Sequence, residues 1–378
     1  MVMGLLRPKG NRLVGLDVGS AALKMVSLQA AGRGGYQVET AATAPLPSGS
    51  IVDGVIAKPD AVGDAIREMF ESNGIKETKV ATSVSGHAVI VKKISLPATT
   101  PQEVKESIQW EAEQYIPFDI ADVYLDYHLL GPSASGKESE VILVAAKRET
   151  IDSHGDIIMM SGKNPVIMDI DAFALHNAYE VNYEPRDESV VALLNIGASI
   201  MNVNIATGRN FVFTRDIGMG GNYYTEYIQR DLGVSYEDAE QYKQGGAPEE
   251  LRLTVSSVIQ SVSEILALEV QKTFDYFRTA SEFDELQNIY ISGGASRTEG
   301  LREYLQETFQ VPVNYLNPFE RVRVNGASLS GRGEDQGAEY AVAVGLALRS
   351  PGDKVQVEGG KGGRSNPVTA LLQKLTRR

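Results

Sequence analysis

A short stretch near the N-terminus combines a carboxylate, a lysine and several small residues at a spacing that suits phosphate binding. In Gly15 to Leu28, GLDVGSAALKMVSL, apolar residues predict two strands, with Asp17 on the first and Lys24 on the second. The turn between them contains Gly19, Ser20 and Ala21. A tight turn with small side chains lets backbone N–H groups approach a phosphate, and the lysine can reach its oxygens. A Mg-bound nucleotide would use all of these groups, whereas the simpler alternative is a β-hairpin with a glycine turn.

The chain then repeats this pattern. Leu193 to Asn204, LLNIGASIMNVN, aligns without a gap on Gly15 to Val26. The matched residues are Asn195 for Asp17, Gly197 for Gly19, Ala198 for Ser20 and Ser199 for Ala21. Two such hairpins that face each other would clamp one phosphate chain from opposite sides. A third turn, Gly293-Gly294, follows a short apolar strand and precedes a helix, which makes it a candidate bed for an adenosine.

Composition limits the alternatives. The chain has 378 residues, enough for a large core in two domains, and it has no cysteine and four histidines, which argues against disulfides and against thiolate or histidine-rich metal sites. Its formal net charge of −13 argues against nucleic acid as a partner. No apolar run approaches the roughly 18 residues of a membrane span, and the N-terminus lacks the apolar core of a signal peptide. We therefore expect a cytoplasmic protein.

Local signals place the helices and strands between the two hairpins. Pro59 and the apolar face of residues 58–73 predict a helix. A capping box at Thr100 starts a second helix that ends before Pro117. Trp110 lies off the apolar stripe of that helix. Strands are predicted at 79–85, 88–95, 124–130 and 140–146, with the Ser85-Gly86-His87 turn between the first two.

The three turns, in this order, resemble those of the actin-like ATPase superfamily. Several segments narrow the resemblance to the PilM family of FtsA-like type IV pilus assembly proteins: SGSIVDGVIAKPDAV, HAVIVKKISLP, IQWEAEQYIPF and EVQKTFDYF. The resemblance spans nearly the whole chain. It implies an α/β fold of the actin-like type, which is a duplicated RNase H-like, two-lobed architecture with an inserted module of the FtsA 1C type.

The resemblance implies roles for individual residues toward ATP and Mg²⁺. Asp17 would order water on the metal, and Lys24 with the amides near Ser20 and Ala198 would hold the phosphates. Gly220 and Gly221 would approach the ribose, Glu269 and Lys272 would face the nucleoside, and Gly293 with Gly294 would lie against the adenosine. For Glu269 and Lys272 the alternative is an exposed ion pair.

Two positions bear on hydrolysis. Asp171 stands where relatives place the group that positions the attacking water, although it is also a suitable helix N-cap. Relatives usually carry Asp at the second hairpin, where this chain has Asn195. Losing a carboxylate weakens the water and metal network, so we expect ATP binding with at most slow ATPase activity.

The same resemblance predicts the organisation of the chain. The expected parts are a basic arm (1–12), domain I (13–190) with the inserted module (about 82–160), domain II (191–337), a closing helix that packs on domain I (338–349), and a Gly-rich linker with a basic tail (350–378). Val368, Leu371, Leu372 and Leu375 share one helical face of that tail. Such a face can lie on anionic lipid, but a frayed terminus has the same sequence pattern.

The implied function is a scaffold of the pilus inner-membrane platform, peripheral on the cytoplasmic face, that supports pilus biogenesis and twitching motility. Its implied partners are the cytoplasmic N-terminal peptide of PilN and other inner-membrane pilus components. The peptide is expected between domain I and the inserted module, near Trp110, Tyr115 and Phe118; alternatively, Trp110 is covered by the loop GPSASGKE. The alternative functions are an FtsA-like, membrane-associated filament former and a small-molecule kinase.

Overall fold

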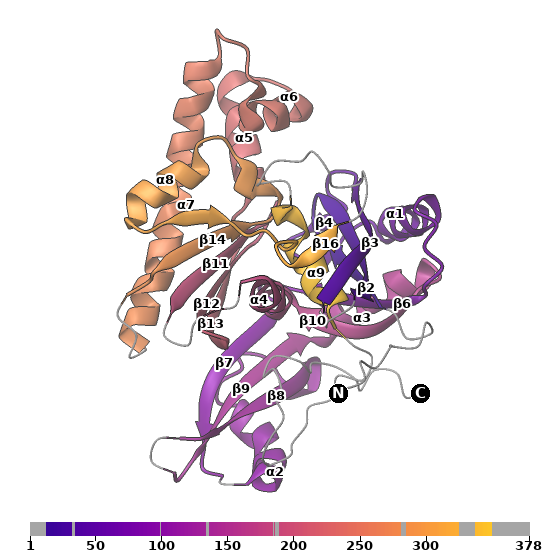
Figure 1. The fold of residues 1–378 in the computed structure, drawn as a ribbon, viewed down its shortest axis with the longest axis vertical. Coiled ribbons are helices and arrows are strands. Elements are labelled where there is room, and N and C mark those ends of the chain that lie inside the picture. The colour runs from indigo at the N-terminus through magenta and orange to yellow at the C-terminus, as the bar shows by residue number, and fades with distance from the viewer. Residues whose placement is uncertain are drawn as a thin grey trace.

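The computed structural model of the chain describes residues 13–31, 35–98, 100–133, 136–183, 185, 189–280, 285–324 and 337–349. The predicted arm 1–12, the linker and tail 350–378 and nearly all of the loop NGASLSGRGEDQG lie outside the described residues. Two lobes lie side by side, each built on a β-sheet, and a smaller module extends from the first lobe (Figure 1). The actin-like, two-lobed prediction is therefore confirmed.

The first lobe is built on a sheet whose described strands have the order β10-β6-β1-β2-β3-β16. β1 pairs antiparallel with β2 and parallel with β6. One face packs on α1, where Val62, Ile66 and Phe70 are fully buried. The strands are β1 (Val14–Val18), β2 (Ala22–Ala31), β3 (Gly35–Pro45), β6 (Lys79–Val84), β10 (Asn164–Ile170) and β16 (Val322–Val324), with the small hairpin β4 (Ile51–Val52) and β5 (Val55–Ile56) beside them. The helices are α1 (Pro59–Ser72), α3 (Arg148–Met160) and α4 (Asp171–Asn182).

The second lobe repeats this arrangement. Its described strands have the order β13-β12-β11-β14-β15, in which β11 is antiparallel to β12 and parallel to β14. The core lies between this sheet and the helices, around Tyr224, Val262 and Leu266. The strands are β11 (Val190–Ile196), β12 (Met201–Thr207), β13 (Asn210–Ile217), β14 (Asn288–Ser292) and β15 (Val313–Tyr315). The helices are α5 (Gly221–Leu232), α6 (Tyr236–Gln241), α7 (Arg252–Ala280) and α8 (Leu301–Phe309), with short helical turns η3 (Tyr242–Gly246) and η4 (Gly294–Arg297).

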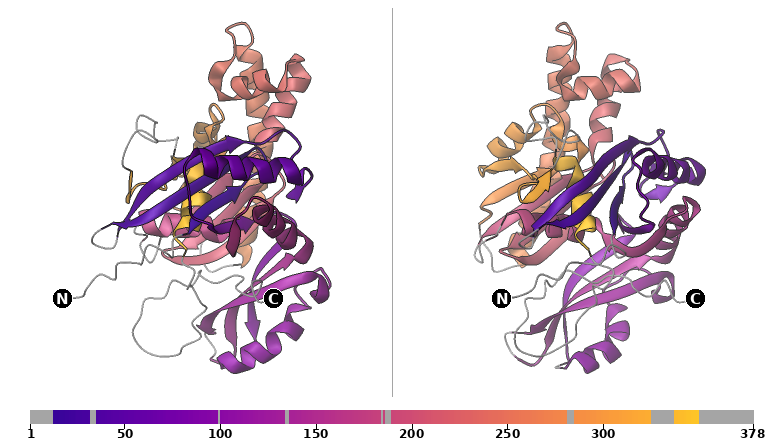
Figure 2. Two further views of the ribbon diagram at one scale, coloured as in Figure 1. Left: turned by 90° about the vertical axis from the view of Figure 1, so that its right-hand side faces the viewer. Right: turned by 45° about the vertical axis from the view of Figure 1, so that its right-hand side comes forward.

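The inserted module is a three-stranded antiparallel sheet, β7-β9-β8, covered by α2. Its elements are β7 (Val89–Leu96), α2 (Pro101–Ala112), the turn η2 (Ile120–Asp122), β8 (Val123–Pro132) and β9 (Ser139–Lys147). The predicted capping box is present at Thr100, whose side chain and backbone both bond Glu103. The module lies at one end of the molecule and α6 at the other, as the turned views also show (Figure 2).

The last described helix packs back on the first lobe. α9 (Ala341–Ala347), preceded by the turn η5 (Ala338–Tyr340), contacts α4, β1 and β2. A Cβ atom on Gly345 would lie 1.7 Å from the carbonyl oxygen of Ala174 in α4, and one on Gly15 would lie 2.2 Å from the carbonyl oxygen of Ala343. The buried ion pair Arg349–Asp169, with 2.6 Å between the nitrogen and the oxygen, ties the end of this segment to β10.

Two segments differ from the predicted organisation. β16 lies within the range expected for domain II, but it pairs in parallel with β3 at the edge of the first sheet. A strand of three residues has too little apolar pattern to predict. α3 lies within the range expected for the module, yet its buried Ile157 and Ile158 pack with the first-lobe core around α1. The sheet of the module itself spans only residues 89–147.

Candidate functional site

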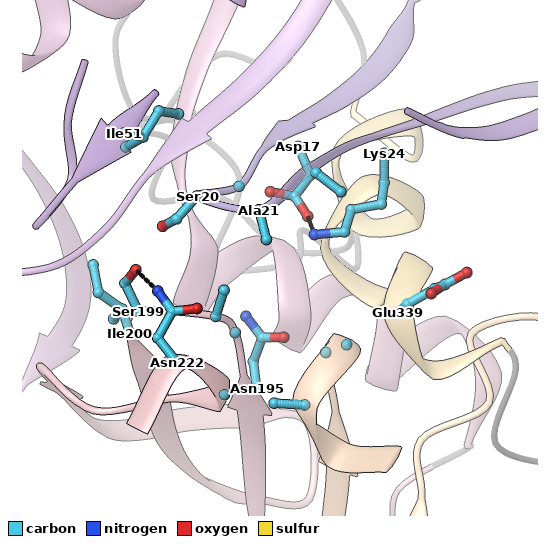
Figure 3. Close-up of a pocket in the computed structure, with 18 of the residues that line it drawn as sticks. Asp17, Ser20, Ala21, Lys24, Ile51, Asn195, Ser199, Ile200, Asn222 and Glu339 are labelled. Carbon is cyan, nitrogen blue, oxygen red and sulfur yellow. Dashed lines mark hydrogen bonds and ion pairs between the residues drawn. The ribbon is translucent and has the colours of Figure 1, made fainter. Parts of the chain in front are cut away.

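A cavity of about 250 Å³ lies between the two lobes. The two glycine hairpins identified in the sequence face each other across it, with Asp17, Ser20 and Lys24 on one side and Asn195 and Ser199 on the other (Figure 3). The remaining predicted nucleotide-site residues on its wall are Gly19, Ala21, Asp171, Gly197, Ala198, Gly221, Gly293 and Gly294. Asp17 and Asn195 occupy aligned positions that are nearly 180 residues apart in the chain. The fold brings both of them to the same cavity.

The first hairpin presents an ion pair to the cavity. Asp17 and Lys24 are cross-strand partners on β1 and β2, and the distance from Lys24 Nζ to Asp17 Oδ2 is 3.3 Å. Both side chains are largely shielded: 15% of the Lys24 side chain and 14% of the Asp17 side chain are exposed. A Cβ atom on Gly19 would lie 3.0 Å from Lys24 Nζ, so the bare glycine leaves the ammonium group open toward the turn.

The second hairpin is held by the N-terminus of α5. The Gly197 amide donates to the Ile200 carbonyl to close the turn, and the Gly197 and Ala198 carbonyls accept from the Gly221 and Asn222 amides. A Cβ atom on Gly220 would lie 2.4 Å from the Gly197 carbonyl oxygen, so this close approach requires glycine. Gly220 thus supports the hairpin, whereas Gly221 and Asn222 line the cavity.

The third glycine turn also approaches the second hairpin. Gly293 has φ +83°, and a Cβ atom there would lie 2.4 Å from the Ile196 carbonyl oxygen and 2.8 Å from Asn195 Oδ1. Both the left-handed conformation and the close contact favour glycine. Behind this turn, Arg297 pairs with Glu339 at 2.9 Å, and both residues line the cavity.

Asp171 is a partly buried acid that lines the cavity between the lobes. Ser83 donates a hydrogen bond of 2.6 Å to Asp171 Oδ1. Burial is the main cause that raises the pKa of Asp171 to about 7, and the negative charge of Asp17 adds to the shift. Ile170 occupies the N-cap position of α4 and Asp171 is the first residue of the helix, so Asp171 is not the N-cap.

A series of hydrogen-bonded residues connects Asn195 in the cavity to the backbone of Gly86. Asn195 Nδ2 donates to Asn202 Oδ1 (2.8 Å), and Asn202 Nδ2 donates to Asp216 Oδ1 (2.7 Å). Asp216 Oδ2 then accepts from the backbone amide of Gly86 (2.6 Å). Asn195 and Asn202 are cross-strand partners on β11 and β12, the position that Asp17 and Lys24 occupy in the first lobe.

Sequence reasoning missed one group of cavity residues. Tyr236, Glu240 and Lys243 line the wall that α6 and η3 form. Lys243 is 5% exposed, and its Nζ bonds Glu240 Oε1 (2.5 Å) and Thr225 Oγ1 (3.0 Å). Burial lowers the pKa of Lys243, and Glu240 opposes this. The signal in the sequence was an acid and a base three residues apart after the helix cap Ser235.

Glu269 and Lys272 lie elsewhere. They form an ion pair on α7, with 2.5 Å between Lys272 Nζ and Glu269 Oε1, and neither residue lines the cavity. Arg215 of β13 is a further partner of Glu269 at 3.8 Å. The geometry therefore agrees with the alternative of an ion pair outside the nucleotide site.

A second cavity, of about 300 Å³, lies where the inserted module meets both lobes. Its wall combines apolar residues of the module with polar residues of β13. The lining includes Val89, Val91, Pro117 and Phe118 from the module, Val84 and Asp171 from the first lobe, and Thr214, Arg215 and Asp216 from the second lobe.

Of the three predicted partner-binding residues, only Phe118 lines this cavity. Trp110 is 74% exposed on α2, so the alternative of a covered tryptophan is wrong. Tyr115 is partly buried against the core of the module.

The cavity suits a metal only together with a phosphate ligand. Among the described residues, no group of three or more histidine or acidic side chains could hold a metal ion. However, the Asp17 charge raises the pKa of Asp171, so a cation near these two carboxylates would relieve an existing repulsion. Mg²⁺ commonly keeps several waters and binds through one or two carboxylates plus phosphate oxygens.

In the described part of the chain, one helix, Arg252–Thr279, is long and apolar enough to cross a membrane. Its apolar face, including Val258, Val262 and Leu266, forms part of the second-lobe core. A core helix of a folded lobe explains this length and composition.

The chain was compared with known families, sequences and structures. A family model described as type IV pilus assembly protein PilM matches residues 15–351. Cell division protein FtsA from Pseudomonas aeruginosa is 23% identical, with 97% of each chain covered. Among solved structures, the PilM-PilN type IV pilus biogenesis complex has a TM-score of 0.79 at 29% identity, covering 90% of this chain and 98% of that chain. Ethanolamine utilization protein EutJ from Carboxydothermus hydrogenoformans has a TM-score of 0.55 at 15% identity, with 91% of each chain covered, a likeness of fold alone.

Proposed function

Because the chain belongs to the PilM family of type IV pilus assembly proteins, we propose that it binds ATP between its lobes and recruits the cytoplasmic N-terminal peptide of PilN. In this proposal it acts on the cytoplasmic face of the inner membrane, within the pilus assembly platform, and supports pilus biogenesis and twitching motility. Other inner-membrane pilus components would be further partners.

The observation that carries the nucleotide proposal is the pair of facing hairpins. Both turns are built from small residues, and Lys24 is available to phosphate oxygens at the cost of its ion pair with Asp17. A charge-assisted contact of this kind is worth roughly 1.5–3 kcal/mol. Mg²⁺ would be held by the phosphates and, through water, by Asp17, where it would neutralise charge on the phosphate chain.

The geometry supports a different nucleoside wall from the one that the sequence suggested. Glu240 and Lys243 lie in the cavity close to Gly221, whose carbonyl oxygen is 3.4 Å from Lys243 Nζ. Gly293 and Gly294 lie on the same cavity wall as Arg297. We therefore place the ribose near Lys243 and the adenine against the Gly293-Gly294 turn, and we assign Glu269 and Lys272 no nucleotide contact.

The partner proposal combines the structural likeness with the second cavity. The PilM-PilN complex is similar to this chain over 90% of its length. The second cavity lies beside the inserted module, which is where the sequence resemblance placed the peptide, and Pro117 with Phe118 offers an apolar wall. An extended peptide can anchor an apolar side chain in such a pocket.

Isothermal titration of the full chain with MgATP tests the nucleotide proposal. Lys24→Ala is expected to weaken binding at least about tenfold, since a tenfold loss corresponds to about 1.4 kcal/mol. Lys93→Ala is the matched control, because Lys93 also pairs with one carboxylate, Glu140 at 3.0 Å, but lies on the module away from the cavity. Equal affinities for the two variants would contradict the site.

A further inference from the structure

The exposed side of α2 has no role in the function proposed above. Trp110 is 74% exposed there, while Val104 and Ile108 bury the opposite side of the helix in the core of the module. α2 lies at the end of the module that points away from the two lobes (Figure 1). Tryptophan is enriched among the anchor residues of protein interfaces, so an indole ring this exposed marks a candidate interaction surface.

Carboxylates flank this tryptophan. Glu106 and Glu113 lie one turn before and one turn after Trp110 on the same side of the helix, and both are exposed. Residues 101–113 contain four glutamates and one lysine, which gives this stretch a side-chain charge of −3. The face of an indole ring attracts cations, and the neighbouring carboxylates add to this attraction. The surface formed by Glu106, Trp110 and Glu113, which we call the Trp110 face, therefore fits a segment that combines apolar and cationic side chains.

The chain itself contains such a segment, outside the described residues. Residues 366–378, NPVTALLQKLTRR, contain three cationic side chains and no acidic one. The apolar positions noted above, 368, 371, 372 and 375, have the spacing of one helical face, and by the same spacing Lys374 and Arg378 border that face. Arg377 falls on the opposite side. The segment thus offers leucines next to cations, where the Trp110 face offers an aromatic ring next to carboxylates.

The last described residue lies at the base of the module, within reach of α2. Arg349 pairs with Asp169 of β10, and Asp169 is in register with Ser83 near the end of β6. The chain enters the module directly after β6. The first strand of the module, β7, has 8 residues, so the module sheet is about 27 Å long. Residues 350–365 can span at most about 53 Å, which is enough to bring the segment 366–378 to α2.

From these observations we propose that residues 366–378 bind the Trp110 face of the same molecule. Leucine side chains of the segment lie against the indole ring, and the two cations that border its apolar face lie next to Glu106 and Glu113. Because the segment is tethered to α9, its effective concentration at α2 is of millimolar order, so a contact too weak to hold two separate molecules together suffices. The contact requires neither nucleotide nor the PilN peptide.

The experiment uses the fluorescence of Trp110, which is the only tryptophan in the chain. Quenching by acrylamide is measured on the full chain in the absence of lipid. The double variant Leu371→Ser with Leu375→Ser is expected to raise the Stern–Volmer quenching constant about twofold, because the segment no longer excludes solvent from the indole ring. Equal quenching constants in this variant and in the wild type would overturn the proposal.

Charge reversal tests the orientation of the segment. Arg378→Glu should raise the quenching constant, whereas Arg377→Glu should leave it at the wild-type value. The second variant is the matched control, because it makes the same change in charge on the opposite side of the segment. Adding Glu106→Lys and Glu113→Lys to Arg378→Glu should restore the wild-type constant. Equal effects of the two arginine variants, or a failure of the added lysines to restore protection, would contradict the proposed contact.

Cross-linking identifies the molecule that supplies the segment. The chain has no cysteine, so pairs of cysteines can be introduced without background. A bismaleimide should join Gln114→Cys, one turn after Trp110, to Thr376→Cys within one molecule, and should join the exposed Glu68→Cys of α1 to Thr376→Cys in much lower yield.

Two other occupants of these surfaces have distinct outcomes. Cross-linked dimers in place of the intramolecular product would assign the Trp110 face to the segment of a second copy. Flotation of the wild type with vesicles of phosphatidylglycerol and phosphatidylcholine, together with Trp110 quenching equal to that of the double serine variant, would assign the segment to the membrane. Either result would overturn the proposal.

Discussion

The protonation state of Asp171 connects its burial to the stability of the chain. Its carboxyl group is partly buried between the lobes, accepts a hydrogen bond from Ser83 and lies close enough to Asp17 to be affected by that charge. Burial and this charge raise the pKa to about 7, against an ordinary value near 3.8. The folded chain therefore binds a proton at Asp171 more tightly than the unfolded chain does.

Asp171→Asn should remove this proton linkage. Between pH 4 and 7 the wild-type folded state holds more protons than the unfolded state, so Asp171 lowers the free energy of unfolding as the pH rises and has no further effect above the folded pKa. The amide isostere should match the wild type near pH 4 and become more stable by on the order of 3 kcal/mol at pH 8. Urea unfolding of the nucleotide-free chain across this pH range measures the difference in the free energy of unfolding. If this free energy changes with pH in parallel for the variant and the wild type, the raised pKa is contradicted.

Lys243 and Lys272 offer a matched test of the nucleoside wall. Each pairs with an acid three residues earlier, but only Lys243 lines the cavity. Lys243→Ala is expected to weaken ATP binding at least about fivefold, about 1 kcal/mol, whereas Lys272→Ala should leave it unchanged. Calorimetric titration of both variants with ATP shows whether Lys243 or Lys272 contacts the nucleoside. Their melting temperatures check that both variants fold. A larger loss in Lys272→Ala would restore the assignment suggested by the sequence.

Residue types predicted the two hairpins that line the cavity better than the wall that α6 and η3 form. Asp17 with Lys24, and Asn195 with its glycine turn, were visible because chemistry and strand pattern coincide within one short hairpin. Glu240 and Lys243 were missed because their pattern, an acid and a base three residues apart, occurs on many exposed helices. Only the packing of η3 against α5 buries this lysine and turns it toward the cavity.

Among the elements, α2 shows which structural features local sequence signals can predict and which they cannot. The capping box and the apolar stripe predicted its start and its buried face, Val104, Ile108 and Ala112. The pattern also predicted that Trp110 lies off that face, and the side chain is exposed. It could not predict that Phe118, eight residues later, turns into the second cavity under the ammonium group of Lys147, because that contact joins the connection after α2 to the end of β9, which is distant in the sequence.

Phe118 and Trp110 therefore make a paired test of the partner surface. Phe118→Ala is expected to weaken PilN-peptide binding about tenfold or more, since an aromatic anchor in a pocket commonly contributes over 1 kcal/mol. Trp110→Ala should have the smaller effect, because Trp110 lies outside the cavity. Anisotropy titrations measure both, with MgATP binding as the control for folding. A larger loss in Trp110→Ala would move the peptide onto the outer face of α2.

The duplication of the whole molecule was visible in the sequence, but the contacts between its halves were not. The gap-free alignment revealed two similar hairpins, the actin-like resemblance implied a duplicated two-lobed fold, and the matching strand orders of the two sheets confirm the duplication. The bond between Asp216 and Gly86 joins residues 130 positions apart, and nothing near either residue predicts it. The same holds for α4, whose Ala172 carbonyl accepts from Asn204 of the second lobe while its other side packs on α9.

The packing of α9 on α4 supplies a test of the whole assembly. Because α4 is shared between the lobes and a Cβ atom on Gly345 would lie 1.7 Å from the Ala174 carbonyl oxygen, Gly345→Ala must push α9 away from α4 and β1. We expect a loss of at least about 3 kcal/mol, the upper range for overpacking, because the clash is with rigid backbone. Gly155→Ala in α3 is the control, since a Cβ atom there has nothing within 4 Å, and it should stabilise its helix by up to about 1 kcal/mol. Melting temperatures that move in opposite directions would support α9 as the element that fixes α4, whereas equal melting temperatures would show that α9 can shift without cost.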